Sequence, residues 1–179
     1  QGRMMPRILH VLDHSLPLHS GYTFRTRAIM SAQLAMGWQV EGATGVRQYQ
    51  GGEEMGAPQQ TVDGLTFHRT MATIKAPSPV LEWREVAALT QRIVELHRES
   101  PFDLLHAHSP VINGLAAMRA ARILKIPFLY EIRAFWEDAA VGNGTGTEGS
   151  AQYRLTRALE THVARRADAV TVICEGLRN

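Results

Sequence analysis

The chain has 179 residues and a formal net charge of +2, and 45% of its residues are hydrophobic while 20% are charged. A chain of this length and composition buries a core of its own, which excludes a disordered polypeptide, because such chains lack the apolar surface that offsets conformational entropy. The single cysteine excludes an intramolecular disulfide framework, and basic residues spread along the chain give no argument for nucleic acid as a partner.

The first part of the sequence predicts a strand, a loop and a helix. Residues 7–13 read RILHVLD, a short apolar core that indicates a buried strand, and the stretch HSLPLHSG after it indicates a loop. From Tyr22 onward apolar residues recur at helical spacing, and Gly37 stands where a C-cap glycine belongs. We expect a second strand over 39–45, and the Asp63-Gly64 pair predicts a hairpin that adds a small antiparallel element.

The rest of the sequence alternates between helices and strands. Ser78 and Pro79 predict the start of a long amphipathic helix, with the hydroxyl as its cap. Further elements are expected at 103–107 (strand), 113–125 (helix), 127–132 (strand), 150–167 (helix) and 168–173 (strand). This alternation predicts an α/β domain with a Rossmann-like, doubly wound and mainly parallel sheet that helices cover on both faces.

The first loop contains a candidate anion site at Ser20-Gly21-Tyr22. Ligands of open parallel sheets gather at the carboxyl ends of the strands, where loops enter helices. Free backbone N–H groups and the helix dipole favour an anion at such a position, Gly21 would let a phosphate approach the backbone, and Arg25 or Arg27 would add charge. The alternative is an ordinary capped helix start.

The stretch DLLHAHSP places His106 and His108 two residues apart. A metal site would need both rings on one face, which a strand allows, and at least one further ligand, which the sequence does not offer nearby. We therefore expect no metal. If the strand ends at Ala107, His108 enters the loop and faces the ligand, whereas His106 stays packed as a core histidine.

The stretch YEIRAFWEDAA carries charges within and just after a buried-strand pattern. Glu131 and Arg133 fall on one side of the strand, and Glu137 follows in the loop. Buried charges are costly unless they are paired or used. One interpretation is an internal salt bridge, and the other is recognition of a hydroxyl- or phosphate-bearing ligand.

The late helix carries a basic series formed by Arg154, Arg157, Arg165 and Arg166. Such a series is commonly a solvated face, and the alternative is a weak attraction to anionic lipid headgroups. No apolar run approaches the about 18 residues that span a bilayer, and no signal-peptide pattern is visible. We expect a cytoplasmic protein, with weak peripheral contact at the inner face of the cytoplasmic membrane as the alternative.

Four segments together resemble the N-terminal domain of family-4 retaining glycosyltransferases with the GT-B fold. They are RILHVLDHSLPLHSGYTFRTRAI, DLLHAHSPVINGLAA, YEIRAFWEDAA and RRADAVTVICEGLR, and the resemblance covers essentially the whole chain. The narrower stretch IRAFWEDAA is similar to bacterial glycosyltransferases associated with exosortase A systems and exopolysaccharide synthesis.

The resemblance implies that residues 1–179 form one Rossmann-like domain, the acceptor-side half of a two-domain enzyme whose C-terminal donor-binding domain is absent. Such an enzyme transfers a sugar from a nucleotide-sugar donor to a glycan or lipid-linked acceptor with retention of configuration, and without a cofactor or a catalytic metal. The half alone is expected to be inactive.

The same resemblance assigns roles to residues. It implies that the Gly21 backbone faces the donor diphosphate, and that His108 contacts the transferred sugar as electrostatic support while the leaving phosphate helps to deprotonate the acceptor. The expected catalytic residue is His108, and the expected substrate-binding residues are Ser20, Gly21, Tyr22, Arg25, Glu131, Arg133 and Glu137. Two alternatives stay open: a stand-alone Rossmann-like ligand-binding module, and half of a GT-B sugar-nucleotide epimerase.

Overall fold

The computed structural model describes residues 5–49, 56–135 and 147–175. Strands and helices alternate along this part of the chain, as the sequence predicted. The strands are β1 (Arg7–Leu12), β2 (Gln39–Thr44), β3 (Gln59–Val62), β4 (Leu65–Arg69), β5 (Leu104–His108), β6 (Phe128–Phe135) and β7 (Ala169–Glu175). The helices are α1 (Gly21–Ala35), α2 (Val80–Glu99), α3 (Val111–Leu124) and α5 (Thr147–Arg166), with a short 3-10 helix η1 (Val46–Tyr49).

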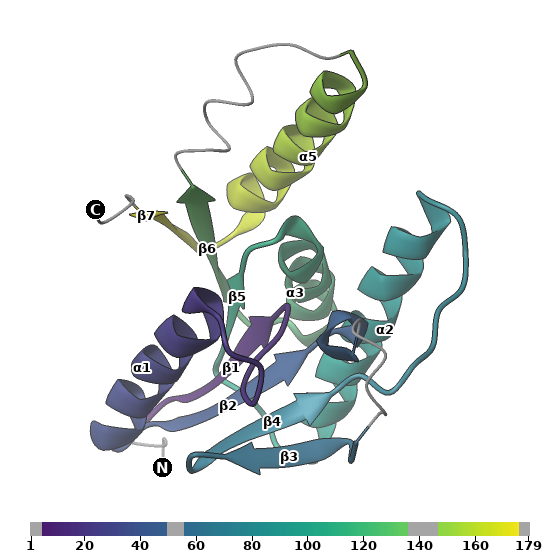
Figure 1. Ribbon diagram of the computed structural model, residues 1–179. Helices are drawn as coiled ribbons and strands as arrows, with labels where there is room; N and C mark the ends of the chain where they lie inside the picture. The colour runs from purple at the N-terminus through teal and green to yellow at the C-terminus, as the bar shows by residue number, and fades with distance from the viewer. Residues whose placement is uncertain (1–4, 50–55, 136–146, 176–179) are drawn as a thin grey trace.

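The seven strands form one sheet in the order β3-β4-β2-β1-β5-β6-β7 (Figure 1). Every pairing is parallel except that between β3 and β4, the antiparallel hairpin that the sequence predicted. From β1 the chain adds β2 and the β3–β4 hairpin on one side of the sheet. Helix α2 then returns the chain to the other side of β1, where β5, β6 and β7 follow. The topological switch point therefore lies between β1 and β5, where a doubly wound sheet places its ligand.

The two faces of the central strands differ in character because side chains alternate along a strand. One face is apolar and packs against α2 and α3, and its buried residues include Leu9, Val11, Leu105, Ala107, Phe128 and Tyr130. The other face lies toward α1 and is polar, and its buried residues include His10, His108, Glu131 and Arg133. The apolar face makes the main core, so the polar face is available for chemistry.

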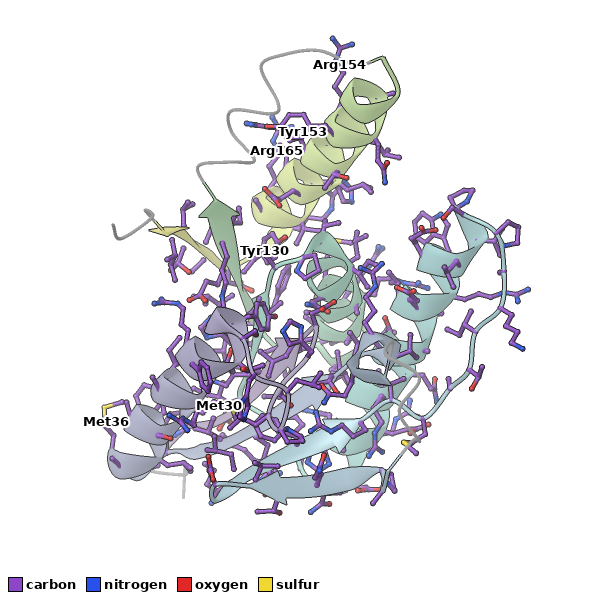
Figure 2. The ribbon with its side chains drawn as sticks, in the orientation of Figure 1. Met30, Met36, Tyr130, Tyr153, Arg154 and Arg165 are labelled. Atoms are coloured by element: carbon purple, nitrogen blue, oxygen red, sulfur yellow. The ribbon has the colours of Figure 1, made fainter. Side chains whose placement is uncertain are left out.

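Helix α1 is fixed to the sheet by a second, smaller apolar cluster. Leu12, Met30, Val40 and Phe67 belong to it and are all buried. Figure 2 shows Met30 on the sheet side of α1 and Met36 at the far end of the helix, where the side chain is exposed. The apolar cluster lies over β1, β2 and β4, so α1 meets the polar residues of β5 and β6 along its other flank.

The turn residues that the sequence singled out have the expected conformations, with one exception. Asp63 and Gly64 both have positive φ, at 52° and 77°, and Gly37 has φ 86° directly after the C-cap of α1. Ser78 does not cap α2, contrary to the prediction. The helix begins one residue later than expected, its N-cap is Pro79, and Ser78 Oγ instead donates to Glu82 Oε1 at 2.6 Å.

Helix α5 packs on α3 mainly through Val163, which is fully buried. The four arginines of its basic series are exposed, and Figure 2 shows Arg154 near the tip of α5 that points away from the sheet. None of the helices in the described ranges combines the length and the apolar character that a membrane crossing requires.

Candidate functional site

The candidate site lies where β1, β5 and β6 run side by side toward α1. In the parallel register His10 is opposite His106, and His108 is opposite Glu131. Residues that are opposite one another in parallel strands point to the same face, so these side chains gather on the polar face of the sheet. This position is the topological switch point of the sheet.

Three histidine rings lie together at the centre of the polar face, two of them stacked and the third tilted against them. The His106 and His108 rings are nearly parallel, with 6° between their planes and 4.3 Å between centroids, and His10 lies 4.7 Å from His106. His108 is the last residue of β5 and is fully buried, which contradicts the prediction that the strand ends at Ala107 and that His108 enters the loop. His106 is the less buried of the two, with 12% of its side chain exposed, so their expected order is reversed.

A chain of hydrogen bonds links α1, β1, β5 and β6 through the His10 and His108 rings. His108 Nδ1 lies 2.9 Å from Glu131 Oε2, and a carboxylate at this distance takes the Nδ1 proton as its hydrogen bond. His108 Nε2 then accepts from His10 Nδ1, 2.8 Å away. His10 Nε2 lies 2.8 Å from the side-chain amide of Gln33, which carries both a donor and an acceptor. The Glu131 and His10 contacts favour the tautomer of His108 that carries its proton on Nδ1, although Arg133 Nη2 also lies 3.1 Å from that nitrogen.

The electrostatics of this chain keep both histidines neutral and the carboxyl ionised. Burial lowers the pKa of His108 to about 4, and burial together with the neighbouring His108 ring also lowers the pKa of His10. Burial alone raises the pKa of Glu131, but the His106 and His108 rings beside it outweigh burial and hold that pKa below its ordinary range. Neutral rings beside an ionised carboxylate match the tautomer that the distances indicate.

Arg133 joins the same carboxylate to the first turns of α1. It is buried, its Nε lies 3.4 Å from Glu131 Oε2, and its other nitrogens reach the Tyr22 carbonyl oxygen at 3.2 Å and Thr26 Oγ1 at 3.1 Å. Its guanidinium also lies 4.0 Å from the centroid of the Tyr22 ring. The internal salt bridge between Glu131 and Arg133, one of the two sequence interpretations, is confirmed. These contacts hold the first turns of α1 against β6.

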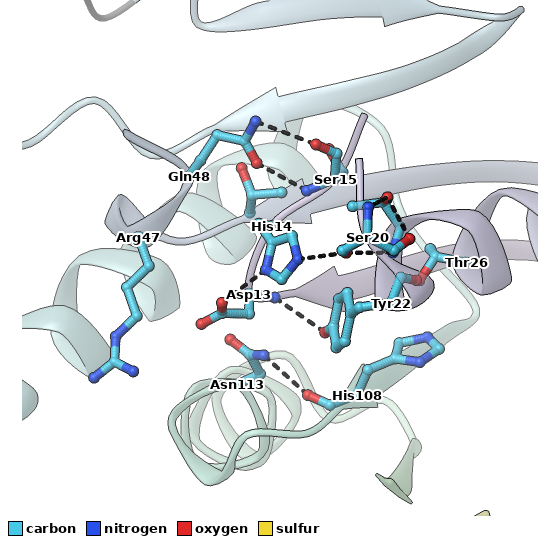
Figure 3. A network of polar contacts seen from close by, with 12 residues as sticks. Asp13, His14, Ser15, Ser20, Tyr22, Thr26, Arg47, Gln48, His108 and Asn113 are labelled. Atoms are coloured by element: carbon cyan, nitrogen blue, oxygen red, sulfur yellow. Dashed lines mark hydrogen bonds and ion pairs between the residues drawn. The ribbon is translucent and has the colours of Figure 1, made fainter. Parts of the chain in front are cut away.

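A second, more accessible array follows the end of β1 (Figure 3). His14 Nδ1 lies 2.9 Å from Asp13 Oδ2, and His14 Nε2 lies 3.0 Å from Ser20 Oγ. Ser20 is the N-cap of α1 and forms a capping box with Thr23: its Oγ accepts from the Thr23 backbone N–H, and Thr23 Oγ1 accepts from the Ser20 backbone N–H. An aspartate, an imidazole and a hydroxyl thus lie in a line at the start of the helix.

Tyr22 connects the two networks. Its hydroxyl accepts from the Asp13 backbone N–H at 3.1 Å, and its ring stacks on the His14 ring with 4.7 Å between centroids. The buried network of His108 and Glu131 reaches Tyr22 through Arg133. Burial raises the pKa of the Tyr22 hydroxyl well above its ordinary value, so this group keeps its proton.

The loop between β1 and α1 is held from the sheet side by Arg69, the end of β4. Its guanidinium is fully buried and donates to Ser15 Oγ at 2.5 Å, to the Leu16 carbonyl oxygen at 2.7 Å and to Gln60 Oε1 at 2.9 Å. Gln48 of η1 adds two bonds to the backbone of Ser15. The loop that carries Asp13, His14 and Ser20 is therefore anchored at its base.

The fold brings His10 next to His106 and His108, which gives a third candidate metal ligand that the sequence did not indicate. Ligand atoms of His10, His106 and His108 lie within 4.8 Å of one another. A metal lies in the plane of each imidazole that binds it, whereas the His106 and His108 planes are stacked and nearly parallel. His108 also has the Arg133 cation 3.1 Å from its Nδ1. The rings are arranged for stacking and hydrogen bonding rather than for a shared ion.

The structure brings together most of the expected site residues. Ser20, Gly21, Tyr22, Glu131, Arg133 and His108 all lie around the first turn of α1 and the carboxyl ends of β5 and β6. Arg25 is half-buried, and its Nε has no hydrogen-bond partner among the residues that the structure describes. Glu137 lies outside the described residues.

Sequence reasoning missed several residues of these networks, among them His10, Asp13, His14 and Gln33. Asp13 and His14 follow a buried strand directly, and the rule that ligands gather at the carboxyl ends of strands was enough to single them out. His10 and Gln33 carry no such signal, because only the register of β1 on β5 and the placement of α1 bring them to His108.

Residues 20–179 match the family described as "Glycosyl transferase 4-like domain". No curated protein sequence matches the chain at a significant level. Among solved structures, sucrose-phosphate synthase from Thermosynechococcus elongatus is similar, with a TM-score of 0.60 and 12% identity over 94% of this chain and 47% of that one. MurG from Acinetobacter baumannii is similar with a TM-score of 0.52 and 13% identity, over 94% of this chain and 45% of that one.

The glycosyltransferase SnogD from Streptomyces nogalater is also similar, with a TM-score of 0.52 and 17% identity over 95% of this chain and 44% of that one. Likeness at these identities establishes the fold, a mostly parallel α/β half of the GT-B type. The chain spans less than half the length of each of these three structures.

Proposed function

The chain belongs to the glycosyl transferase 4-like domain family, and from this premise we propose that it is the acceptor-side half of a two-domain glycosyltransferase. The observation that carries the proposal is the family match over residues 20–179 in a chain that covers less than half of its structural neighbours. A second α/β domain would supply most of the nucleotide-sugar site. Without that domain this half is expected to be inactive.

We propose that the whole enzyme is a hexosyltransferase that moves a sugar from a nucleotide-sugar to a glycan or lipid-linked acceptor with retention of configuration. The support is the resemblance of four segments to retaining family-4 enzymes. The stretch IRAFWEDAA supports the narrower proposal of an exosortase-associated enzyme of exopolysaccharide synthesis. No cofactor is required for this reaction.

The first turn of α1 is the proposed place where the donor diphosphate meets this domain. Gly21 is exposed, and a Cβ placed on it would meet nothing within 4 Å, so the backbone at this position is open to an approaching phosphate. The N–H groups of Ser20 and Thr23 are already bonded within the capping box, so the phosphate would meet those of Gly21 and Tyr22. Ser20, Tyr22 and Arg25 are proposed to surround the same position.

His108, Glu131 and Arg133 are proposed to support that turn from beneath. Their side chains are buried and their polar atoms face one another and α1, so the direct effect of the network is to fix the position of Tyr22 and of the helix start. The contact of His108 with the transferred sugar, and a substrate role for Glu137, stay predictions.

The exposed arginines of α5 are proposed to give weak contact with an anionic membrane surface when the acceptor is lipid-linked. A basic patch alone binds such a surface weakly, because each charge contributes about 1 kcal/mol near the membrane. This contact would place the enzyme at the inner face of the cytoplasmic membrane.

The proposal is tested with the intact enzyme and a panel of UDP-glucose, UDP-galactose, UDP-N-acetylglucosamine and GDP-mannose. We expect one donor to yield a glycoside whose new linkage, read by NMR, keeps the configuration of the donor. His108→Ala is expected to lower the transfer rate. Absence of transfer from every donor, or epimerised nucleotide-sugar formed without acceptor, would contradict the proposal.

A further inference from the structure

We propose that Asp13, His14 and Ser20 form a proton relay that receives the proton of the acceptor hydroxyl during sugar transfer. The inference rests on the proposed function, because it names the groups on this domain that act on the acceptor. None of the three residues belongs to the buried network of His10, His108 and Glu131, and the sequence analysis assigned only Ser20 to the site.

Asp13, His14 and Ser20 form one line of hydrogen-bonded groups. Asp13 Oδ2 is 2.9 Å from His14 Nδ1, and His14 Nε2 is 3.0 Å from Ser20 Oγ. A hydroxyl within hydrogen-bond reach of an imidazole, itself oriented by a carboxylate, is the arrangement that activates a hydroxyl for proton transfer. The carboxylate takes the Nδ1 proton, which leaves the lone pair of Nε2 directed at Ser20.

Ser20 can accept one further hydrogen bond. Its hydroxyl has one proton and two lone pairs. The proton is donated to His14 Nε2, and one lone pair accepts the Thr23 backbone N–H at 3.2 Å as the helix cap. The second lone pair has no partner among the residues that the structure describes. An acceptor hydroxyl fits there as a donor.

The line of three groups lies at the surface, next to the proposed donor site. The side chains of His14 and Asp13 are 25% and 20% exposed, so the array borders solvent, unlike the fully buried His108. Ser20 is the residue before Gly21, at the point where the proposed donor diphosphate meets α1. Tyr22 stacks on the His14 ring and holds it in place. The relay thus lies beside the proposed reaction centre and is fixed by neighbouring groups.

In the proposed step one bond forms, one bond breaks and one proton moves along the relay. The acceptor oxygen forms a bond to the anomeric carbon while the bond from that carbon to the nucleotide diphosphate oxygen breaks. The acceptor proton passes to Ser20 Oγ as the Ser20 proton passes to His14 Nε2, and Asp13 stabilises the resulting imidazolium. The diphosphate leaves with the electron pair of the broken bond, and the proton on His14 later returns to solvent.

The test compares variants of the intact enzyme with the donor panel above and octyl β-glucoside and octyl α-mannoside as acceptors. His14→Gln is expected to lower kcat by about 10²-fold or more, the usual contribution of acid–base catalysis. Asp13→Asn should act in the same direction, because an amide no longer fixes the tautomer. Ser20→Gly removes the hydroxyl at small cost to the helix cap and should also lower kcat, whereas Ser20→Thr should restore it.

Two controls separate proton transfer from structure. His19→Gln changes an exposed histidine of the same loop and should keep most of the wild-type kcat. In His14→Ala, added imidazoles should restore activity at rates that rise with their basicity, which a merely structural role would not produce.

The outcomes separate the relay from the proposed function. An active wild type with an equally active His14→Gln variant would overturn the relay alone and assign the proton to the leaving phosphate. A sugar found covalently attached to Ser20 would also overturn it, since Ser20 would then be a nucleophile. A wild type that transfers sugar from none of the donors would refute the proposed function, and the relay with it.

Discussion

The Nε2 atom of His108 lies 2.8 Å from the Nδ1 atom of His10, and both side chains are fully buried. The two residues are 98 positions apart in the sequence, and their contact joins β1 to β5 at the switch point of the sheet. Because His108 also contacts Glu131, one polar chain crosses three adjacent strands. A buried polar network favours one specific packing when all its hydrogen bonds are made, and it destabilises the fold when one of them is lost.

Loss of His10 should therefore destabilise the fold. In His10→Leu the buried Nε2 of His108 loses its partner, and an unsatisfied buried polar group costs about 1–3 kcal/mol. We expect the free energy of unfolding, measured by urea titration at pH 7, to fall by that amount. His19→Leu, at an exposed position, is the control and should change it by less than about 0.5 kcal/mol. Equal stability of the two variants would contradict the role given to the His10–His108 contact.

Stability should also decline as the solution is acidified below neutral pH. The pKa of His108 is about 4 in the folded protein against 6.5 for an unperturbed histidine. Between these values the unfolded chain binds a proton that the folded chain does not, so the free energy of unfolding falls as pH drops from about 6.5 to about 4. The difference in pKa corresponds to about 3 kcal/mol, and the lowered pKa of His10 acts in the same direction.

The measurement is the slope of unfolding free energy against pH, between pH 7 and pH 4.5, for wild type and His108→Gln. The variant lacks the titrating ring, so its slope should be shallower whatever its absolute stability. Glu131 contributes on the acid side, because its lowered pKa gives stability that is present above the ordinary carboxyl range and lost as pH falls through and below it. Identical slopes above pH 5 would show that His108 titrates normally.

Arg69 should matter for both stability and the shape of the first loop. Its buried guanidinium donates to Ser15, Thr44, Leu16 and Gln60. Arg69→Met keeps much of the volume but leaves those acceptors unpaired, so we expect the free energy of unfolding to fall by at least about 2 kcal/mol. Arg122→Met, at an exposed position on α3, is the matched control and should leave stability nearly unchanged. Similar stabilities in the two variants would show that the Arg69 contacts are dispensable.

Most of the fold could be predicted because its signals are local. Alternating apolar segments gave the order of strands and helices, and the Asp63-Gly64 pair gave the hairpin, since its turn requires positive φ at both positions. The predicted start of α2 was one residue too early. A serine-proline pair is compatible with the serine or the proline as the N-cap residue, and the structure has the proline there. Ser78 accordingly bonds to Glu82 instead of capping the helix.

The candidate site was predicted less completely because its contacts are not local. The pairing of Glu131 with Arg133 was one of two interpretations that the cost of burying a charge left open, and the structure confirms it. The placement of His108 was wrong because one additional residue of β5 decides whether the ring lies under α1 or in the loop. His10 sits in the middle of an apolar strand, and only the register of β1 on β5 brings it to His108.

Two glycine variants should separate a ligand contact from a packing requirement. A Cβ on Gly42 would lie 2.7 Å from Phe67 Cδ1 and 3.3 Å from Leu12 Cδ1, inside the apolar cluster beneath α1. Gly42→Ala should therefore cost about 1–3 kcal/mol by overpacking. A Cβ on Gly21 would meet nothing within 4 Å, and this glycine does not have a positive φ, so Gly21→Ala should leave stability within about 0.5 kcal/mol of wild type.

The informative measurement on Gly21→Ala is therefore activity. If the donor diphosphate approaches the backbone at the start of α1, as proposed, the added methyl group blocks that approach, and the KM for the nucleotide-sugar should rise while the protein stays fully folded. Gly42→Ala should show the opposite pattern, with lower stability and a KM close to wild type in the fraction that remains folded. An unchanged KM in Gly21→Ala would place the diphosphate elsewhere, because no packing effect is available at this position to hide the loss of a contact.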